Sequence, residues 1–325
     1  MYDVVAIGEL LIDFTPRGVT ADGTALFERN PGGAPGNVLA ILARLGRKTA
    51  LISKVGEDQF GEFLISVMKN IGVETKNILT TKDAGTTLAF VHLDSKGDRS
   101  FSFYRKPGAD MLLGERDVDI GLVRNTRIFH FGTVSMTCDP SRGATLHAVK
   151  TAKENGVIIS FDPNLRPPLW SSLQEAKEVI KVGLQYADIL KVSKEELEFI
   201  TEITDLEEGS KYISEKYGIH LILVTLGASG CFYRLGAQIG NLHTYDVKTV
   251  DTTGAGDAFL GAFIYQVIDK KKALTDLNKS EMEQMIDFAN AAGSLATVKK
   301  GAIPAMPTVA EIEECIKTVN KLVRF

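Results

Sequence analysis

The sequence has no excess of positive charge and no long apolar run. Lysine and arginine together number 37 against 41 aspartates and glutamates, which gives a formal net charge of -4. A nucleic-acid-binding domain carries a basic face, so this balance argues against a nucleic-acid partner. No apolar stretch approaches the ~18 residues that a membrane-spanning helix needs, so we expect no membrane partner either.

Cysteines are also scarce. Cys138, Cys231 and Cys315 are widely separated and odd in number, and no CxxC pair or Cys/His cluster has zinc spacing. We interpret them as reduced thiols. The first residues, MYDVVAIGELLIDF, have acids within the apolar run and no basic start, which predicts a first strand rather than a signal peptide. Together these features predict a cytoplasmic protein.

Two common nucleotide-binding motifs are missing. No Gly-Lys dipeptide occurs, which excludes the P-loop pattern GxxxxGK[ST]. The stretch GAGDAFLG has the wrong spacing for GxGxxG and does not follow the first strand. An NAD-dependent oxidoreductase is therefore unsupported.

What is present is an alternation of apolar strands and amphipathic helices along all 325 residues. Strand candidates such as RIFHFG, VIISFD and DILKVS are followed by segments with apolar residues at helical spacing. The helical positions at the two ends of the chain are Val38, Ile41, Leu42 and Leu45, and Val309, Ile312, Ile316, Val319 and Val323. This pattern predicts a single α/β domain whose mostly parallel sheet is covered on both faces.

Two stretches break the alternation. Residues 12–30 and 86–105 have the composition of strands and hairpins, and neither adjoins a helix of its own. The second is predicted to turn at Ser95, Lys96, Gly97 and Asp98. We expect the two stretches to form a small β-sheet that stands off the main domain as a lid.

The stretch VDTTGAGDAF places small residues directly before a predicted helix. The first N–H groups of a helix lack internal partners, so the amides of Ala255, Gly256 and Asp257 could converge on an anion. Gly254 and Gly256 have no Cβ and would let a phosphate approach closely. The simpler alternative is a tight turn in which Asp257 is only an acid at a helix N-terminus.

This stretch, extended to DTTGAGDAFLGA, resembles the C-terminal signature of the ribokinase-like (PfkB-type) carbohydrate kinases. NPGGAPGNVLAILARLG, residues 30–46, resembles their N-terminal signature, and the order along the chain is the family's. VSKEE, VTLGASG and NAAGSLATVKKGAIPAMP also fall where the family has its motifs, so the resemblance covers essentially the whole chain. It implies a ribokinase-like three-layer α/β/α fold over residues 1–325.

The resemblance also implies site residues. Asp257 would be the general base that takes a proton from a sugar hydroxyl, while Gly254, Ala255 and Gly256 hold the transferring phosphoryl group. Asp13 could instead be a solvated turn acid, and Arg105 or Arg166 a structural ion pair. The residues implied on the sugar side are Asp13, Gly32, Gly33, Asn37, Arg105, Asn164 and Arg166.

For ATP, the resemblance implies a site around Glu196, whose carboxylate organises Mg²⁺ through water. The family's Asn-x-x-Glu motif has Ser193 in place of its asparagine here. The other residues implied for the nucleotide are Thr225, Gly227, Gly230 and Asn290. A monovalent cation site, holding K⁺ mostly through backbone oxygens, is implied at Asp251, Thr253, Ala296, Lys299, Gly301 and Ala305.

We therefore predict an ATP-dependent sugar kinase. FYRKPGADMLL and SFDPNLR are most similar to the fructokinase branch, which makes fructose 6-phosphate. One alternative is 2-keto-3-deoxygluconate kinase, in which two arginines hold the substrate carboxylate. Another is a catalytically silent sugar-binding regulator, which the intact GAGD disfavours. The family also implies a homodimer formed through the lid.

Overall fold

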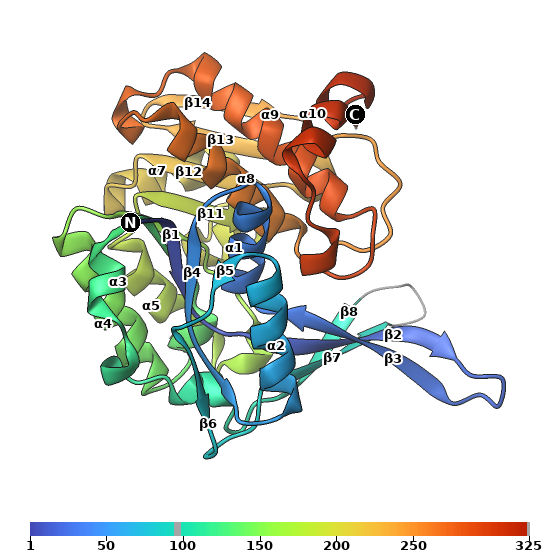
Figure 1. The fold of residues 1–325 in the computed structure, drawn as a ribbon. Helices are drawn as coiled ribbons and strands as arrows, with labels where there is room; N and C mark the ends of the chain where they lie inside the picture. Colours follow the sequence, from blue (N-terminus) through green and yellow to red (C-terminus); the bar gives the residue numbers. More distant parts are fainter. Residues whose placement is uncertain (94–98, 324–325) are drawn as a thin grey trace.

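The computed structural model describes residues 1–93 and 99–323. Within them, a ten-stranded sheet lies between two layers of helices (Figure 1). Its strand order is β14-β13-β12-β11-β10-β9-β1-β4-β5, and β6 also pairs with β4. All pairs are parallel except those of β13 with β12 and with β14. The bounds are β1 Tyr2–Ile7, β4 Thr49–Gly56, β5 Val73–Glu74, β6 Ile78–Thr81, β9 Thr126–Phe131, β10 Ile158–Phe161, β11 Ile189–Ser193, β12 Leu221–Thr225, β13 Cys231–Leu235 and β14 Gln238–Leu242.

Strand β1 shows how the sheet builds two cores. Val4 and Ala6 are buried in one core, whereas Val5 and Ile7 are buried in the other, because successive side chains of a strand point to opposite faces. The first core is covered by α1 Ala34–Arg44, α2 Gln59–Asn70, α8 Ala255–Lys270, α9 Lys279–Ala296 and α10 Val309–Thr318. The second is covered by α3 Ile120–Arg124, α4 Ser141–Glu154, α5 Leu173–Leu184, α6 Lys194–Thr201 and α7 Leu206–Tyr217.

The helical periodicity predicts the N-terminal helix well and the C-terminal helix less well. Val38, Ile41 and Leu42 are fully buried on α1. The last helix, in contrast, ends at Thr318, and Val323 is 52% exposed. The apolar pattern therefore extends one turn too far, because the chain after Val319 is drawn into a bridge between Tyr245 and Lys321.

The two stretches without helices form a separate sheet of order β3-β2-β7-β8, which projects from the main body (Figure 1). Strands β2 and β7 run parallel, with Phe14 opposite Phe90, and their rings stack at 4.8 Å between centroids. The predicted turn at residues 95–98 lies outside the described residues. The bounds are β2 Leu11–Val19, β3 Ala25–Gly32, β7 Leu88–Leu93 and β8 Arg99–Tyr104. We call this sheet the lid.

The lid and the main sheet meet where α1 and α8 begin. Strand β3 leads through Gly33 directly into α1, and α1 packs against α8 through Gly261, where a Cβ would collide with the Ile41 side chain. The N-termini of both helices consequently lie at the carboxyl edge of the parallel strands. In open α/β sheets this edge is where ligands bind.

Candidate active site

The GAGD stretch is the loop and first turn of α8. Gly254 is the N-cap residue, with φ 76°, and a Cβ there would meet the Ala302 side chain at 2.5 Å. The Ala255 N–H donates to the Thr252 carbonyl at 3.3 Å. The amides of Gly256 and Asp257 lie in the first turn, where a helix offers no acceptor of its own. Of the amides that the sequence suggests for an anion, these two are the best placed.

Asp257 lies one residue further along α8 and is held by a second helix. The Asn37 amide nitrogen on α1 donates to its Oδ2 at 2.7 Å. Burial raises the pKa of Asp257 to about 6, and the negative charge of Asp162 adds to this rise. A carboxyl with such a pKa is ionised at neutral pH but is a stronger base than an exposed aspartate.

A small cavity of about 70 Å³ opens beside Asp257. It brings together most of the sugar-side residues that the sequence predicts, from β2, α1 and the loop after β10. These are Asp13, Gly33, Asn37, Asn164 and Arg166. Gly32 lies next to this cavity, since a Cβ there would collide with the Asp13 carboxylate. Gly33 has φ 111°, and a Cβ there would collide with the Glu9 carbonyl.

Two polar side chains of this cavity have environments that suit a ligand. Burial raises the pKa of Asp13 to about 7, against the opposing charge of Arg166. Within the described part of the chain, the Asn37 Oδ1 atom is buried without a hydrogen-bond partner. An orphaned buried acceptor costs stability, so a hydroxyl donor from a ligand would satisfy it.

Arg105 is placed differently from Arg166. Its Nε donates to Asp110 Oδ2 at 2.8 Å, its Nη1 to Thr137 Oγ1 at 2.8 Å and its Nη2 to the Val134 carbonyl at 3.0 Å. The side chain is 3% exposed and is not among the residues that line the cavity. The structure thus matches the alternative that the sequence left open, an internal ion pair, whereas Arg166 faces the cavity.

A buried lysine, which the sequence motifs do not single out, lies beneath residues 254–257, the predicted anion-binding turn. Lys191 Nζ on β11 pairs with Asp162 Oδ2 at 2.9 Å and lies 3.1 Å from where a Cβ of Gly256 would be. Burial alone would lower the pKa of Lys191, but the charges of Asp162, Glu196 and Asp257 outweigh burial and raise it. A lysine within the apolar strand DILKVS is the signal that could have identified it.

Glu196 and Ser193 form a capping box at the start of α6. Ser193 Oγ accepts from the Glu196 N–H at 3.1 Å, and Glu196 Oε2 accepts from the Ser193 N–H at 2.8 Å. Glu196 Oε1 accepts from the Leu165 N–H at 2.7 Å. Both residues line a cavity of about 660 Å³ that also reaches Lys191, Gly256 and Asp257. Ser193 is therefore a helix cap, and Glu196 faces the space between the two ends of the site.

A third cavity, of about 560 Å³, also borders the predicted anion-binding turn, at Ala255 and Gly256. Its lining includes the four further residues predicted for ATP, and Thr252 and Gly256 are shared with the 660 Å³ cavity. The turn Gly227–Ser229 (η5) is flanked by Gly230, whose φ is 95°. Asn290 Nδ2 donates to the carbonyls of Leu242 and His243 at 3.2 and 3.3 Å, so its amide also holds this wall. The four residues are Thr225, Gly227, Gly230 and Asn290.

The residues predicted for a monovalent cation converge only in part. Asp251 Oδ1 accepts from the Thr253 N–H at 2.9 Å, and its Oδ2 accepts from the Gly301 N–H at 3.0 Å. Ala296 ends α9, and Ala305 ends the short helix Ile303–Ala305 (η7) that follows Gly301. The Lys299 side chain is 61% exposed and lies 3.9 Å from Glu311. Lys299 could therefore contribute to such a site only through its backbone.

Among residues 1–93 and 99–323, no group of three histidine, cysteine, aspartate or glutamate side chains could hold a metal ion. Across the same residues, every helix is too short or too polar to cross a membrane.

The chain is similar to known proteins along nearly its entire length. It matches the pfkB family of carbohydrate kinases over residues 1–309. It is 43% identical over 319 residues to fructokinase-2 of Solanum lycopersicum, covering 97% of this chain and 96% of that one. A solved structure of fructokinase with bound ATP from Xylella fastidiosa has a TM-score of 0.90 at 33% identity, covering 98% and 99% of the two chains. A double mutant of fructokinase from Vibrio cholerae, in a form with fructose, ADP and potassium ion bound, has a TM-score of 0.87 at 32% identity, covering 97% and 98%.

Proposed function

The chain belongs to the pfkB family of carbohydrate kinases, and we propose that within this family it is a fructokinase that transfers the γ-phosphoryl group of ATP to fructose. The products are fructose 6-phosphate and ADP. One observation carries the proposal most directly. Asp257, fixed by Asn37 at 2.7 Å, lies in the wall shared by the small polar cavity and the 660 Å³ cavity.

The reaction needs a base for the sugar and positive charge for the phosphoryl group. Asp257 takes the proton of the attacking hydroxyl as the bond to phosphorus forms. The first-turn amides of α8 and the Arg166 guanidinium stabilise the charge that spreads onto the phosphoryl oxygens. Lys191 lies beneath Gly256, and its positive charge offsets the repulsion between the Asp257 carboxylate and the phosphoryl group.

ATP binds in the 560 Å³ cavity, with its phosphates directed toward the turn at Gly256. Backbone groups of the glycine-rich segment 227–230 come close to the nucleotide there. Mg²⁺ is usually bound by one or two carboxylates together with substrate phosphates. Glu196, a single acid that faces the cavity beside the anion-binding turn, fits this requirement and would act through water. When bound, Mg²⁺ neutralises charge on the phosphates.

K⁺ is proposed for the loop that Asp251 ties together. The Asp251 carboxylate joins the segment before α8 to Gly301, next to the N-cap Gly254, where a bound cation would add positive potential to the anion-binding turn. The relative from Vibrio cholerae was solved in a form with potassium ion bound. Activity should rise when K⁺ replaces a large organic cation at fixed ionic strength. Identical kinetics in the two salts would remove K⁺ from the proposal.

Fructose is favoured over 2-keto-3-deoxygluconate by the arginines. Two guanidinium groups would clamp the carboxylate of a keto-acid. Of the two arginines considered, Arg166 lines the small cavity, whereas all three nitrogens of Arg105 are engaged within the protein. A neutral sugar needs no second arginine, so this arrangement supports fructose.

An assay of ADP release tests the proposal. Fructose, 2-keto-3-deoxygluconate, ribose, adenosine and fructose 6-phosphate are each supplied with ATP and Mg²⁺. We expect the highest kcat/KM for fructose. A higher kcat/KM for 2-keto-3-deoxygluconate would identify the keto-acid, and not fructose, as the substrate. Binding of sugar without any ADP release would favour a silent regulator.

We also propose a homodimer that forms through the lid. Its apolar side chains Val19, Phe27 and Tyr104 are 66%, 43% and 67% exposed, and a second copy of the chain would cover them. Light scattering coupled to size-exclusion chromatography should give twice the mass of one chain. Tyr104→Glu should shift the population toward the monomer, and a wild type that is already monomeric would contradict the dimer. A cytoplasmic location remains a prediction from the sequence.

A further inference from the structure

One buried carboxyl of the small cavity has no part in the mechanism so far. Glu9 follows β1, is 4% exposed and lines the cavity together with Asp13 and Asn37. Its Oε1 accepts from the Ala34 N–H, the first residue of α1, at 3.0 Å. Among the described residues, only the N–H groups of Ala34 and of Glu9 itself donate hydrogen bonds to this carboxyl. A carboxylate can accept about four, so about half of its capacity is unused.

Glu9 and Asp257 both contact helix α1. Glu9 contacts the helix at Ala34, and Asp257 contacts it at Asn37, three residues later. Three residues advance an α-helix by ~4.5 Å, which is comparable to the breadth of a sugar ring. Both carboxyls line the same cavity, so they would meet different hydroxyls of one sugar molecule.

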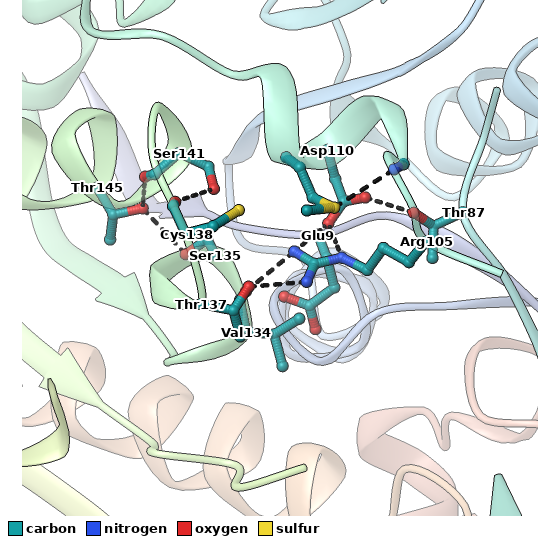
Figure 2. Close-up of polar contacts among 12 residues, drawn as sticks. Glu9, Thr87, Arg105, Asp110, Val134, Ser135, Thr137, Cys138, Ser141 and Thr145 are labelled. Carbon is teal, nitrogen blue, oxygen red and sulfur yellow. Dashed lines mark hydrogen bonds and ion pairs between the residues drawn. The ribbon is translucent and has the colours of Figure 1, made fainter. Parts of the chain in front are cut away.

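The side chains around Glu9 donate no hydrogen bond to its oxygens within the described residues. Figure 2 shows Glu9 beside the Arg105 guanidinium, whose nitrogens bond to Asp110, Thr137 and the Val134 carbonyl. Arg105 thus gives Glu9 a positive neighbour but no hydrogen bond. Burial raises the pKa of Glu9 to about 7, the charge of Asp110 adds to the rise, and Arg105 opposes it. Burying a carboxyl this way is costly unless a ligand supplies the missing donors.

We propose that Glu9 contacts the sugar and determines which pattern of hydroxyls the kinase accepts at the end of the cavity away from Asp257. Arg105 and Asp110 act as positioning residues for Glu9 at the base of the lid. This inference rests on the proposed function and adds a specificity-determining residue to it. The competing explanation is that Glu9 only caps the N-terminus of α1.

Glu9→Gln separates the two explanations. The Gln amide oxygen can still accept from Ala34, so the cap and the fold are kept, but an NH₂ group replaces the second acceptor. With fructose, KM should rise by about 10- to 100-fold, the effect of one hydrogen bond to a charged group, while kcat and the KM for ATP change little. Glu62→Gln removes the same charge from an exposed position on α2 and should leave all three values unchanged.

A set of monodeoxy fructoses then identifies the hydroxyl. Wild type should lose affinity for the analogue that lacks the hydroxyl bound by Glu9, whereas Glu9→Gln should show no further loss with it. Two results would overturn the inference and leave Glu9 as a cap. One is that Glu9→Gln loses as much affinity for every deoxy analogue as wild type does, and the other is an unchanged fructose KM in Glu9→Gln. If Glu9→Gln does not fold, Glu9→Asp, with a shorter carboxyl, serves in the same analysis. Failure of wild type to phosphorylate fructose would instead refute the proposed function. The same comparison of wild type and Glu9→Gln, made with deoxy analogues of the sugar that is phosphorylated, would still test Glu9.

Discussion

The two ends of the proposed site have different linings. The sugar end is a cavity of about 70 Å³ lined by the carboxyls of Glu9, Asp13 and Asp257, all with a pKa raised by burial. The proposed nucleotide end is a cavity of about 560 Å³ lined mostly by small or uncharged residues, among them Gly227, Gly230 and Asn290. We therefore expect a small ligand rich in hydroxyls to be recognised by buried charged side chains, and a large ligand with phosphates mainly by backbone groups and shape.

The strongest test of this comparison removes the base from the sugar end. Asp257→Asn should lower kcat by ~10²–10⁴, the range for loss of general-base catalysis, while ATP still binds, because the nucleotide cavity does not include this side chain. Steady-state kinetics and nucleotide titration measure the two effects. The exposed Asp83→Asn provides the matched control. Near-normal turnover in Asp257→Asn would disprove its role as base.

Arg105→Ala tests whether the buried ion pair supports the sugar end. The substitution leaves Asp110 buried without its partner, so the free energy of unfolding should fall by about 3–5 kcal/mol. Arg127→Ala breaks an exposed pair with Asp3 and should cost about 0–1 kcal/mol. Urea denaturation compares the two variants. If Arg105→Ala leaves the free energy of unfolding unchanged but raises the fructose KM, Arg105 contacts the sugar directly.

At the nucleotide end, Gly230→Ala should weaken ATP binding while fructose binding is retained. Its φ of 95° is strained for any other residue, and a Cβ there would collide with the Leu242 carbonyl. The strain of about 1–3 kcal/mol should distort the turn and raise the ATP KM by ~5- to 150-fold. Gly156→Ala has a similar positive φ, 72°, in open space after α4 and should leave both KM values unchanged. A larger effect on fructose than on ATP would contradict the separation of the two ends.

The pH profile gives the smallest effect. Asp257 must be ionised to accept a proton, and its pKa is raised to about 6. At saturating fructose, kcat should therefore be near its maximum above about pH 7 and fall about tenfold per pH unit well below 6. The carboxyls of Asp13 and Glu9, whose pKa values are raised to about 7, instead affect the fructose KM. Initial rates measured between pH 5 and 8 follow this change. Constant activity down to pH 5 would mean that ionisation of Asp257 does not control the rate between pH 5 and 7.

Features that depend on neighbouring residues in the sequence could be predicted. Alternation of apolar and polar residues identifies α1, the parallel strands and the strands of the lid, because secondary structure follows from local periodicity. The glycines before Asp257 likewise predict the start of α8, because the unpaired amides of a first turn are a local property, and anion binding by these amides stays a prediction. The C-terminal helix was predicted too long because the pairing of Lys321 with the distant Tyr245 competes with helix formation.

Only the tertiary structure decided the surroundings of the charged residues. From the sequence, Arg105 and Arg166 are equivalent candidates for the sugar, and neither Glu9 nor Lys191 stands out as a candidate for the site. Folding buries Arg105 against Asp110, Thr137 and Val134, and leaves Arg166 facing the cavity. The physical reason is that the behaviour of a buried charge depends on desolvation and on partners brought from other elements of the chain. Those partners are fixed by the packing of the sheet, the lid and the two helices α1 and α8, which no local pattern contains.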